Sequence, residues 1–213
     1  MALAGVAGFL DAYGISRYGT YLSFMSGNTT QVGLHIGRQE FTVVPPLAVG
    51  ILGFVCGSFL GAYFAKLFGG LTRRPLLVAI AAATVLVMGF GLAGLPTNFP
   101  SIAILSIAMG AMNSSLPSVG AEAVNLTFVT GTLRRLGVHL ALGARGAPLS
   151  DSQGAWDTHG RRALLLAGIW AGFFLGALLS GALTPPAGAF ALLVPIVALL
   201  VLAVGDRRPK AGA

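Results

Sequence analysis

Charged side chains are scarce in this 213-residue chain. Only 9% of the residues are Asp, Glu, Lys or Arg, while 55% are hydrophobic, and the mean hydropathy is +0.85. A water-soluble domain of this size needs a polar exterior, which this composition cannot supply. The apolar runs 45–67, 75–95 and 163–183 each have about the length of helix that crosses a hydrocarbon layer of roughly 30 Å. The sequence therefore predicts an all-α polytopic membrane protein.

Residue patterns that carry catalysis or metal binding are also lacking. The single cysteine, Cys56, excludes an intramolecular disulfide and lies among glycines in an apolar run, where we interpret it as a packing residue. The sequence contains no nucleophile–base pair, metal-ligand cluster or phosphate-binding loop that stands out. We expect no catalytic residues, no enzyme activity, no metal, no cofactor and no nucleic-acid partner.

A sequence repeat organises the chain. Residues 22–36 read LSFMSGNTTQVGLHI, and residues 126–140 read LTFVTGTLRRLGVHL, with matched Leu, Phe, Gly, His and Ser/Thr positions. Upstream, GFLD at 8–11 corresponds to GAMN at 110–113, which pairs Asp11 with Asn113. Downstream, a glycine at every fourth position occurs twice, and the two series align as Gly53/Gly168, Gly57/Gly172 and Gly61/Gly176. The sequence therefore predicts an internal duplication, with the glycine faces packing against other helices.

We expect six membrane segments, at 2–38, 45–67, 75–95, 99–143, 162–184 and 188–205. The first and fourth are too long for simple spans. The first is interrupted by Gly14, Gly19 and Ser26-Gly27-Asn28. The fourth is interrupted by Ser114-Ser115, Pro117, Gly120 and Gly131. Lipid tolerates a broken helix only where protein or a water-filled cavity satisfies the freed backbone groups. We therefore predict that segments 1 and 4 are discontinuous.

The basic residues predict the orientation of these segments. If each segment crosses once, nine Lys and Arg residues lie on one side and Arg38 alone lies on the other. The positive-inside rule then places both termini in the cytoplasm. Each half, 1–98 and 99–213, contains three spans, so the second half is inverted relative to the first. Such inverted repeats are typical of transporters and channels.

A polar cluster precedes a helical run in each discontinuous segment. We interpret both clusters, Ser26 to Thr29 and Thr130 to Thr132, as helix N-caps. The inverted repeat would aim these two helix N-termini at a common midplane region, where their positive dipole ends favour a small anionic or polar solute. The alternative is that both clusters cap structural kinks. The candidate substrate-binding residues are Asp11, Ser26, Gly27, Asn28, Thr29, Asn113, Glu122, Thr130, Gly131, Thr132 and Arg134.

Ionisable residues in these segments have two interpretations each. Asp11 is either a proton carrier or cation ligand, or the ion-pair partner of Arg17 or of an Arg in the second motif. Arg134 either binds substrate, with its neighbour paired to Glu122, or extends to the membrane surface. We expect His35 and His139 to be interfacial residues or partners of helix C-terminal dipoles.

The motifs GFLDAYG, FMSGNTTQVG and TGTLRRLG resemble those of the YoaK-type family of bacterial inner-membrane proteins, a domain of unknown function. The resemblance covers nearly the whole chain. It maps the family's Asp and [ST]-G-N motif onto Asp11 and Ser26-Gly27-Asn28, and it implies the membrane class and the repeat but no reaction. We expect a small transporter or permease in contact with the lipid bilayer. The alternatives are a passive channel and a membrane structural or partner-binding protein, and a homodimer through the glycine-rich helix faces is a further candidate assembly.

Overall fold

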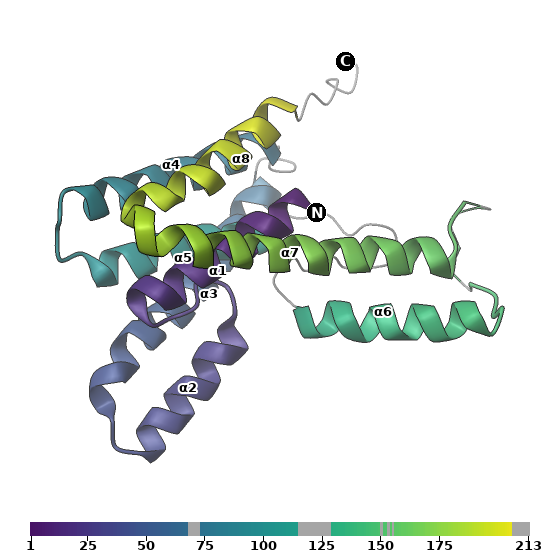
Figure 1. The fold of residues 1–213 in the computed structure, drawn as a ribbon, viewed down its shortest axis with the longest axis horizontal. Helices are drawn as coiled ribbons and strands as arrows, with labels where there is room; N and C mark the ends of the chain where they lie inside the picture. Colours follow the sequence, from purple (N-terminus) through teal and green to yellow (C-terminus); the bar gives the residue numbers. More distant parts are fainter. Residues whose placement is uncertain (68–72, 115–128, 150, 153, 155, 206–213) are drawn as a thin grey trace.

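The computed structural model describes residues 1–67, 73–114, 129–149, 151, 152, 154 and 156–205, and the regular elements in this part of the chain are helices (Figure 1). The elements are α1 (Ala2–Tyr18), α2 (Met25–Gly37), the short 3₁₀ helix η1 (Phe41–Val43), α3 (Val44–Leu67), α4 (Arg73–Leu92), α5 (Asn98–Ser114), α6 (Val129–Ala144), α7 (His159–Ala187), the 3₁₀ helix η2 (Gly188–Leu192) and α8 (Leu193–Gly205). The all-helical class that composition predicted is confirmed.

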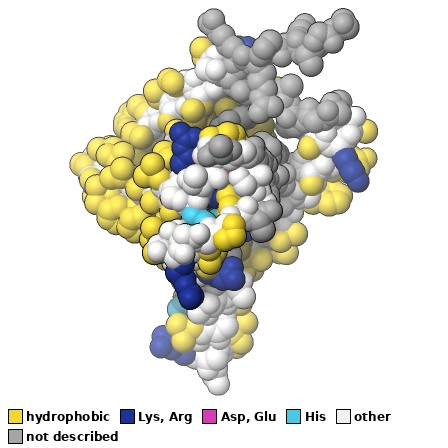
Figure 2. Space-filling model, turned by 90° about the vertical axis from the view of Figure 1, so that its right-hand side faces the viewer, with side chains coloured by type: hydrophobic (Ala, Val, Ile, Leu, Met, Phe, Trp, Pro, Cys, Tyr) yellow, Lys and Arg dark blue, Asp and Glu magenta, His cyan; other side chains and the backbone are white. Residues whose placement is uncertain are grey.

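Three stretches of the described helices are long and apolar enough to cross a membrane, at 41–67, 74–92 and 159–205. The last contains a turn, because Gly188 has a φ of 55° directly after α7 ends, and α8 then runs back beside α4 (Figure 1). Large apolar side chains cover much of the surface, as Figure 2 shows for one face. Leu164 on α7 is 73% exposed and Val201 on α8 is 64% exposed. Such a surface is suited to contact with lipid tails rather than water.

The first segment is interrupted at residues 19–24, which confirms the break expected at Gly19. The breaks expected at Gly14 and at Ser26-Gly27-Asn28 are wrong, because these residues lie inside α1 and α2. Helix α1 ends at Gly19, whose φ of 69° is the left-handed conformation that glycine adopts without strain. The chain then crosses a short non-helical stretch and α2 begins at Met25. In the second half, α5 ends at Ser114 and α6 begins at Val129. The expected breaks at Pro117 and Gly120 lie outside the described residues.

The N-cap interpretation of the two polar clusters is wrong. The N-cap of α2 is Phe24, which forms no side-chain cap, so Ser26 to Thr29 lie inside the helix. The Thr29 hydroxyl donates instead to the carbonyl oxygen of Met25, at 2.8 Å. Asp11 accepts hydrogen bonds from the backbone N–H groups of Leu22 and Ser23, just before α2. In α6, Thr130 to Thr132 likewise fall within the first turn.

Each half of the chain packs mainly on the other half. The most extensive contacts join α3 to α5 and α1 to α7. Both contacts depend on glycine. A Cβ atom added at Gly57 would overlap the backbone of Ile107 on α5, and one added at Gly176 would overlap the backbone of Gly5 on α1. The helices therefore approach too closely at these points for any side chain.

Reciprocal glycine contacts relate α3 to α7. A Cβ at Gly110 of α5 would overlap the backbone of Phe54, and a Cβ at the corresponding Gly8 of α1 would overlap that of Phe173. When Gly8 is aligned with Gly110, the matching contacts align Gly57 of α3 with Gly176 of α7. The sequence had aligned Gly57 with Gly172, which lies one helical turn earlier in α7. Because α5 and α1 cover these glycine faces, the faces are used within one chain rather than left open for a second copy.

The main hydrophobic core lies where α1, α4, α5 and α8 meet. Its fully buried members include Leu10, Leu77, Met109 and Leu199. Helices α2 and α6 lie outside this core, and each packs on one long helix, α2 on α3 and α6 on α7. In Figure 1, α6 and the first half of α7 extend from the body as an arm, here called the α6–α7 arm. The core thus encloses α1, the helix that precedes the interruption.

Candidate functional site

Asp11 forms hydrogen bonds with the non-helical stretch between α1 and α2. Its side chain is only 3% exposed and accepts hydrogen bonds from the backbone N–H of Leu22 at 2.8 Å and of Ser23 at 2.7 Å. The Ser23 hydroxyl donates to the second carboxyl oxygen at 2.6 Å. Asp11 thus satisfies backbone groups that the end of regular helix leaves free. Within the described residues it forms no ion pair with Arg17, which is exposed.

Asn28 holds the same stretch from the other side. Its side chain is completely buried, and its amide group donates to the Tyr21 carbonyl oxygen at 2.7 Å. The amide oxygen accepts from the Tyr21 N–H at 2.9 Å and from the Thr20 hydroxyl at 3.2 Å. Gly50 of α3 lies against this contact, because a Cβ added there would be 3.1 Å from the Asn28 amide nitrogen. Asp11 and Asn28 therefore fix residues 20–23 as one hydrogen-bonded unit.

The remaining candidate residues of the first motif have different environments. Ser26 and Thr29 are exposed on α2, and Gly27 packs against the ring of Phe24. In the first turn of α2 the Ser26 hydroxyl is therefore the candidate group most open to a solute. The Thr29 hydroxyl is already hydrogen-bonded to the backbone.

The second motif repeats this pattern of burial in part. Thr132, which corresponds to Asn28, is buried at 8% exposure, whereas Thr130 and Arg134 are exposed. Asn113, which corresponds to Asp11, lies near the end of α5 and is half-buried. Gly131 is half-buried in the first turn of α6. Glu122 lies outside the described residues.

The structure places the two motifs on separate helix pairs. Helix α2 packs on α3 and α6 packs on α7, and the described residues show no comparable contact between α2 and α6. The residues of each motif lie near one another, around the first turn of their own helix. The meeting of the two motifs at one midplane site stays a prediction.

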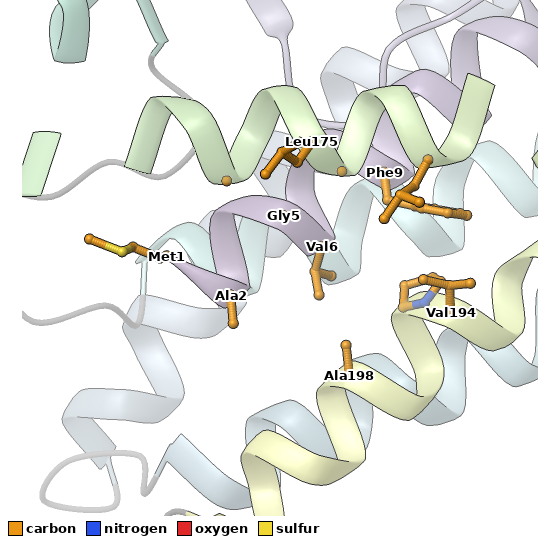
Figure 3. A pocket seen from close by; sticks show the side chains of 12 residues that line it. Met1, Ala2, Gly5, Val6, Phe9, Leu175, Val194 and Ala198 are labelled. Carbon is orange, nitrogen blue, oxygen red and sulfur yellow. The ribbon is translucent and has the colours of Figure 1, made fainter. Parts of the chain in front are cut away.

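A cavity of about 320 Å³ lies between α1, α7 and α8. In Figure 3, Val6 points from α1 toward α8 and Ala198 points from α8 toward α1. Its lining residues are apolar or glycine, and none of the predicted site residues is among them. This cavity suits a hydrocarbon chain and is separate from the polar motifs.

Two histidines that the sequence did not bring together meet in the α6–α7 arm. The Nδ1 atoms of His139 and His159 are 2.8 Å apart, and the two residues are 6% and 7% exposed. His139 is therefore buried and lies before the last turn of α6, so its expected role as a partner of the helix C-terminal dipole is wrong. Its position at the membrane interface stays a prediction. His35 does lie in the last turn of α2, as expected, and pairs with Glu40. Helical periodicity could not predict this contact, because the two histidines lie on different helices. The loop that joins α6 to α7 determines which of their residues meet.

An arginine of α7 forms ion pairs with the loop that joins α6 to α7. Arg162 contacts the carboxyl group of Asp151 at 3.0 Å and that of Asp157 at 2.7 Å. The hydrogen bond from Arg162 holds the pKa of Asp151 below its usual range. A second cavity, of about 430 Å³, lies at this loop, where Ser152, Asp157 and His159 contribute to its lining. The tip of the arm is therefore a polar region next to an apolar helix.

Comparisons with known proteins identify the family. The family model described as "Protein of unknown function (DUF1275)" matches residues 1–205. UPF0700 transmembrane protein RA0705 of Rhizobium meliloti (strain 1021) is 32% identical over 203 residues, which are 94% of this chain and 81% of the relative. UPF0700 transmembrane protein YoaK of Bacillus subtilis (strain 168) is 26% identical over 136 residues, which are 61% of this chain and 60% of the relative. No solved structure matches.

These matches confirm the resemblance to the YoaK-type family, and with the apolar helices they confirm a membrane protein. The chain belongs to the DUF1275 family of transmembrane proteins.

Proposed function

We propose that this protein is a small inner-membrane transporter that carries a small anionic or polar solute. The observation that carries the proposal is the break at residues 19–24, which Asp11 and Asn28 hold in a defined shape inside an apolar helical body. Non-helical backbone at membrane depth is tolerated only where it is buried in protein or lines a cavity. Buried polar residues in such a position mark substrate or ion pathways by default.

The proposed architecture is six spans in two halves of inverted topology, with both termini in the cytoplasm. The matched glycine contacts of α3 with α5 and of α1 with α7 support the duplication. The third helices of the two halves, α4 and α8, also pack on each other, which is compatible with a two-fold relation between the halves. Substrate sites of inverted-repeat transporters lie where discontinuous helices of the two halves meet.

The proposed solute class follows from the groups that are still available at the helix starts. Asp11 already accepts three hydrogen bonds, so its negative charge is compensated by fixed donors. The first turns of α2 and α6 offer their positive dipole ends, and Arg134 is exposed one turn into α6. These groups favour a carboxylate or another small anion over a cation.

A purely structural membrane protein is the second candidate. One observation favours it: the hydrogen bonds described for Asp11 and Asn28 connect them to their own chain. In that case the motifs stabilise kinks and bind no solute. A passive channel of the same architecture differs from a transporter only in how flux depends on concentration and driving force.

Uptake into vesicles tests these alternatives. The purified protein is reconstituted into liposomes, and uptake of labelled small carboxylates, inorganic anions, neutral polar solutes and cations is measured with and without a pH gradient. A transporter gives saturable anion uptake that a gradient drives, and a channel gives uptake that rises linearly with concentration. Arg134→Gln should lower anion uptake severalfold. Arg145→Gln, at the other end of the same helix, should not.

Uptake equal to that of protein-free vesicles for the whole panel would refute transport and support the structural candidate. Uptake restricted to cations or apolar compounds would reject the proposed solute class.

A further inference from the structure

The His139–His159 contact joins the two helices of the α6–α7 arm at its outer end. His139 lies near the end of α6, and His159 is the first residue of α7. Their Nδ1 atoms are 2.8 Å apart, and their ring centroids are 5.1 Å apart. One turn after His139, a Cβ added to Gly143 would lie 3.4 Å from the Cβ of His159. The contact is therefore part of a close helix–helix packing.

A separation of 2.8 Å between two ring nitrogens requires a hydrogen between them. One neutral imidazole can donate from Nδ1 while the other accepts at Nδ1, so the pair holds together with one shared proton. If both rings are protonated, both Nδ1 atoms carry hydrogen and neither can accept. Two positive charges would then also be in contact in a buried place, which is strongly unfavourable. The contact shown here is thus compatible with at most one positive charge on the pair.

The second nitrogen of His159 is also informative. Its Nε2 atom is buried and has no hydrogen-bond partner in the part of the chain that the structure describes. A buried polar atom without a hydrogen-bond partner is destabilising, so this end of the contact is held less firmly than a fully bonded pair would be. Opening the contact exposes Nε2 to water, which compensates for part of the lost packing.

Each element next to the pair carries charged residues. Helix α6 carries Arg134 and Arg135, and Arg145 follows it. Helix α7 carries Arg161 and Arg162, and the loop carries Asp151 and Asp157, both bound to Arg162. Because Arg162 lowers the pKa of Asp151, this carboxyl group stays ionised between pH 5 and pH 8. Histidine is the side chain whose charge ordinarily changes in that range, roughly pH 5–8.

We propose that the His139–His159 contact is a pH-sensitive latch, in which a shared proton holds α6 against α7 and protonation of both rings in acid releases this end of α6. The latch would control how firmly α6, which carries Thr130, Thr132 and Arg134, is attached to the rest of the molecule. It does not depend on the proposed transport activity, because the attachment of α6 is measured without a solute.

Spin-label distances test the latch directly. The single native cysteine is removed by Cys56→Ala, and cysteines are introduced at Leu140 on α6 and Leu164 on α7, which are 57% and 73% exposed. Pulsed electron-spin resonance then measures the distance between the two labels at pH 8 and pH 5. We expect one short distance at pH 8 and a reversible second population at longer distance at pH 5.

Histidine variants assign the change to the pair. His139→Gln and His159→Gln, alone or together, should give distances that are the same at both pH values, because the pair can then no longer carry two positive charges. The matched control is His35→Gln, the third histidine, which lies on α2 beside Glu40 and should leave the pH response intact.

Three results would overturn the proposal. The first is an unchanged distance between pH 8 and pH 5 in the parent, which needs no histidine variant. The second is a pH response that persists in the double glutamine variant. The third is opening of the contact at pH 8 by a metal chelator, because the rings would then hold a metal ion rather than a shared proton.

Discussion

At the scale of single residues, Asp11 decides the shape of the interrupted helix. Sequence reasoning found it because an ionisable side chain is rare in an apolar run. Its partners proved to be Leu22, Ser23 and the Ser23 hydroxyl rather than an arginine. We infer that Asp11 is first of all the residue that satisfies the backbone of the break, whatever solute is bound nearby.

Substitutions at this position should therefore affect stability. Asp11→Asn turns an amide donor toward groups that themselves donate, and should cost roughly 1–3 kcal/mol of unfolding free energy. Ser23→Ala removes one of three donors and should cost roughly 0.5–1.5 kcal/mol. Thermal unfolding in detergent measures both. Ser26→Ala, at an exposed position three residues on, is the control, and an equal loss there and at Ser23 would contradict the role of Asp11.

Which residues are polar at the break could be predicted from the sequence, but their hydrogen bonds could not. Asn28 was grouped with Ser26 and Thr29 because all three can cap a helix. Only the fold shows that Asn28 is buried and hydrogen-bonded to both backbone groups of Tyr21, while Ser26 is exposed. The difference arises because α3 covers one side of α2, and a linear pattern does not contain that packing.

At the scale of helices, glycine contacts set the distances between the two halves. Gly57→Ala and Gly176→Ala should each destabilise the fold, because the added methyl group would overlap backbone atoms of the facing helix, and overpacking costs typically about 1–3 kcal/mol. The melting temperature measures the loss. Gly181→Ala is the control on α7, since nothing lies within 4 Å of its added Cβ. Melting temperatures equal to that of the parent at Gly57 and Gly176 would place these faces against lipid.

The loop between α6 and α7 should respond to acid at a defined point. Because the folded pKa of Asp151 is depressed by Arg162, this contact stabilises the loop above the unfolded pKa of about 3.9. That contribution is lost as the pH falls through the lower folded value. In a Trp170→Phe background, the fluorescence of Trp156 should report this change only in strong acid, and Asp151→Asn should abolish it. A transition that Asp151→Asn leaves unaltered would assign the acid response to another group.

The helices could be predicted well from the sequence, with two instructive exceptions. Length and hydropathy located the apolar helices, and glycine marked the end of α1 at Gly19. The register between α3 and α7 was displaced by one turn because a glycine at every fourth position matches itself after a shift of four. The start of α2 was placed too late because Ser and Thr side chains can also bond to carbonyl groups inside a helix, as Thr29 and Thr30 do.

At the scale of the whole molecule, the two halves form one body. Helix α1 of the first half packs on α7 of the second, and α5 of the second half packs on α3 of the first. Neither half buries its glycine faces alone. We therefore expect fragments 1–98 and 99–213 to be unstable when expressed separately and to recover a folded complex when expressed together. Copurification measures this, and a stable isolated half would contradict the exchange of contacts.

The opposite orientation of the two halves is the central claim of the proposed transporter, and cysteine labelling tests it most directly. In a Cys56→Ala background, single cysteines replace Gly70, Pro96, Ser152 and Pro185 in intact cells. A membrane-impermeant thiol reagent should label the cysteines at Pro96 and Pro185 from outside, and those at Gly70 and Ser152 only after the cells are opened. Labelling of the cysteine at Pro96 only from the cytoplasmic side would contradict three crossings per half, and the inverted repeat would then be wrong.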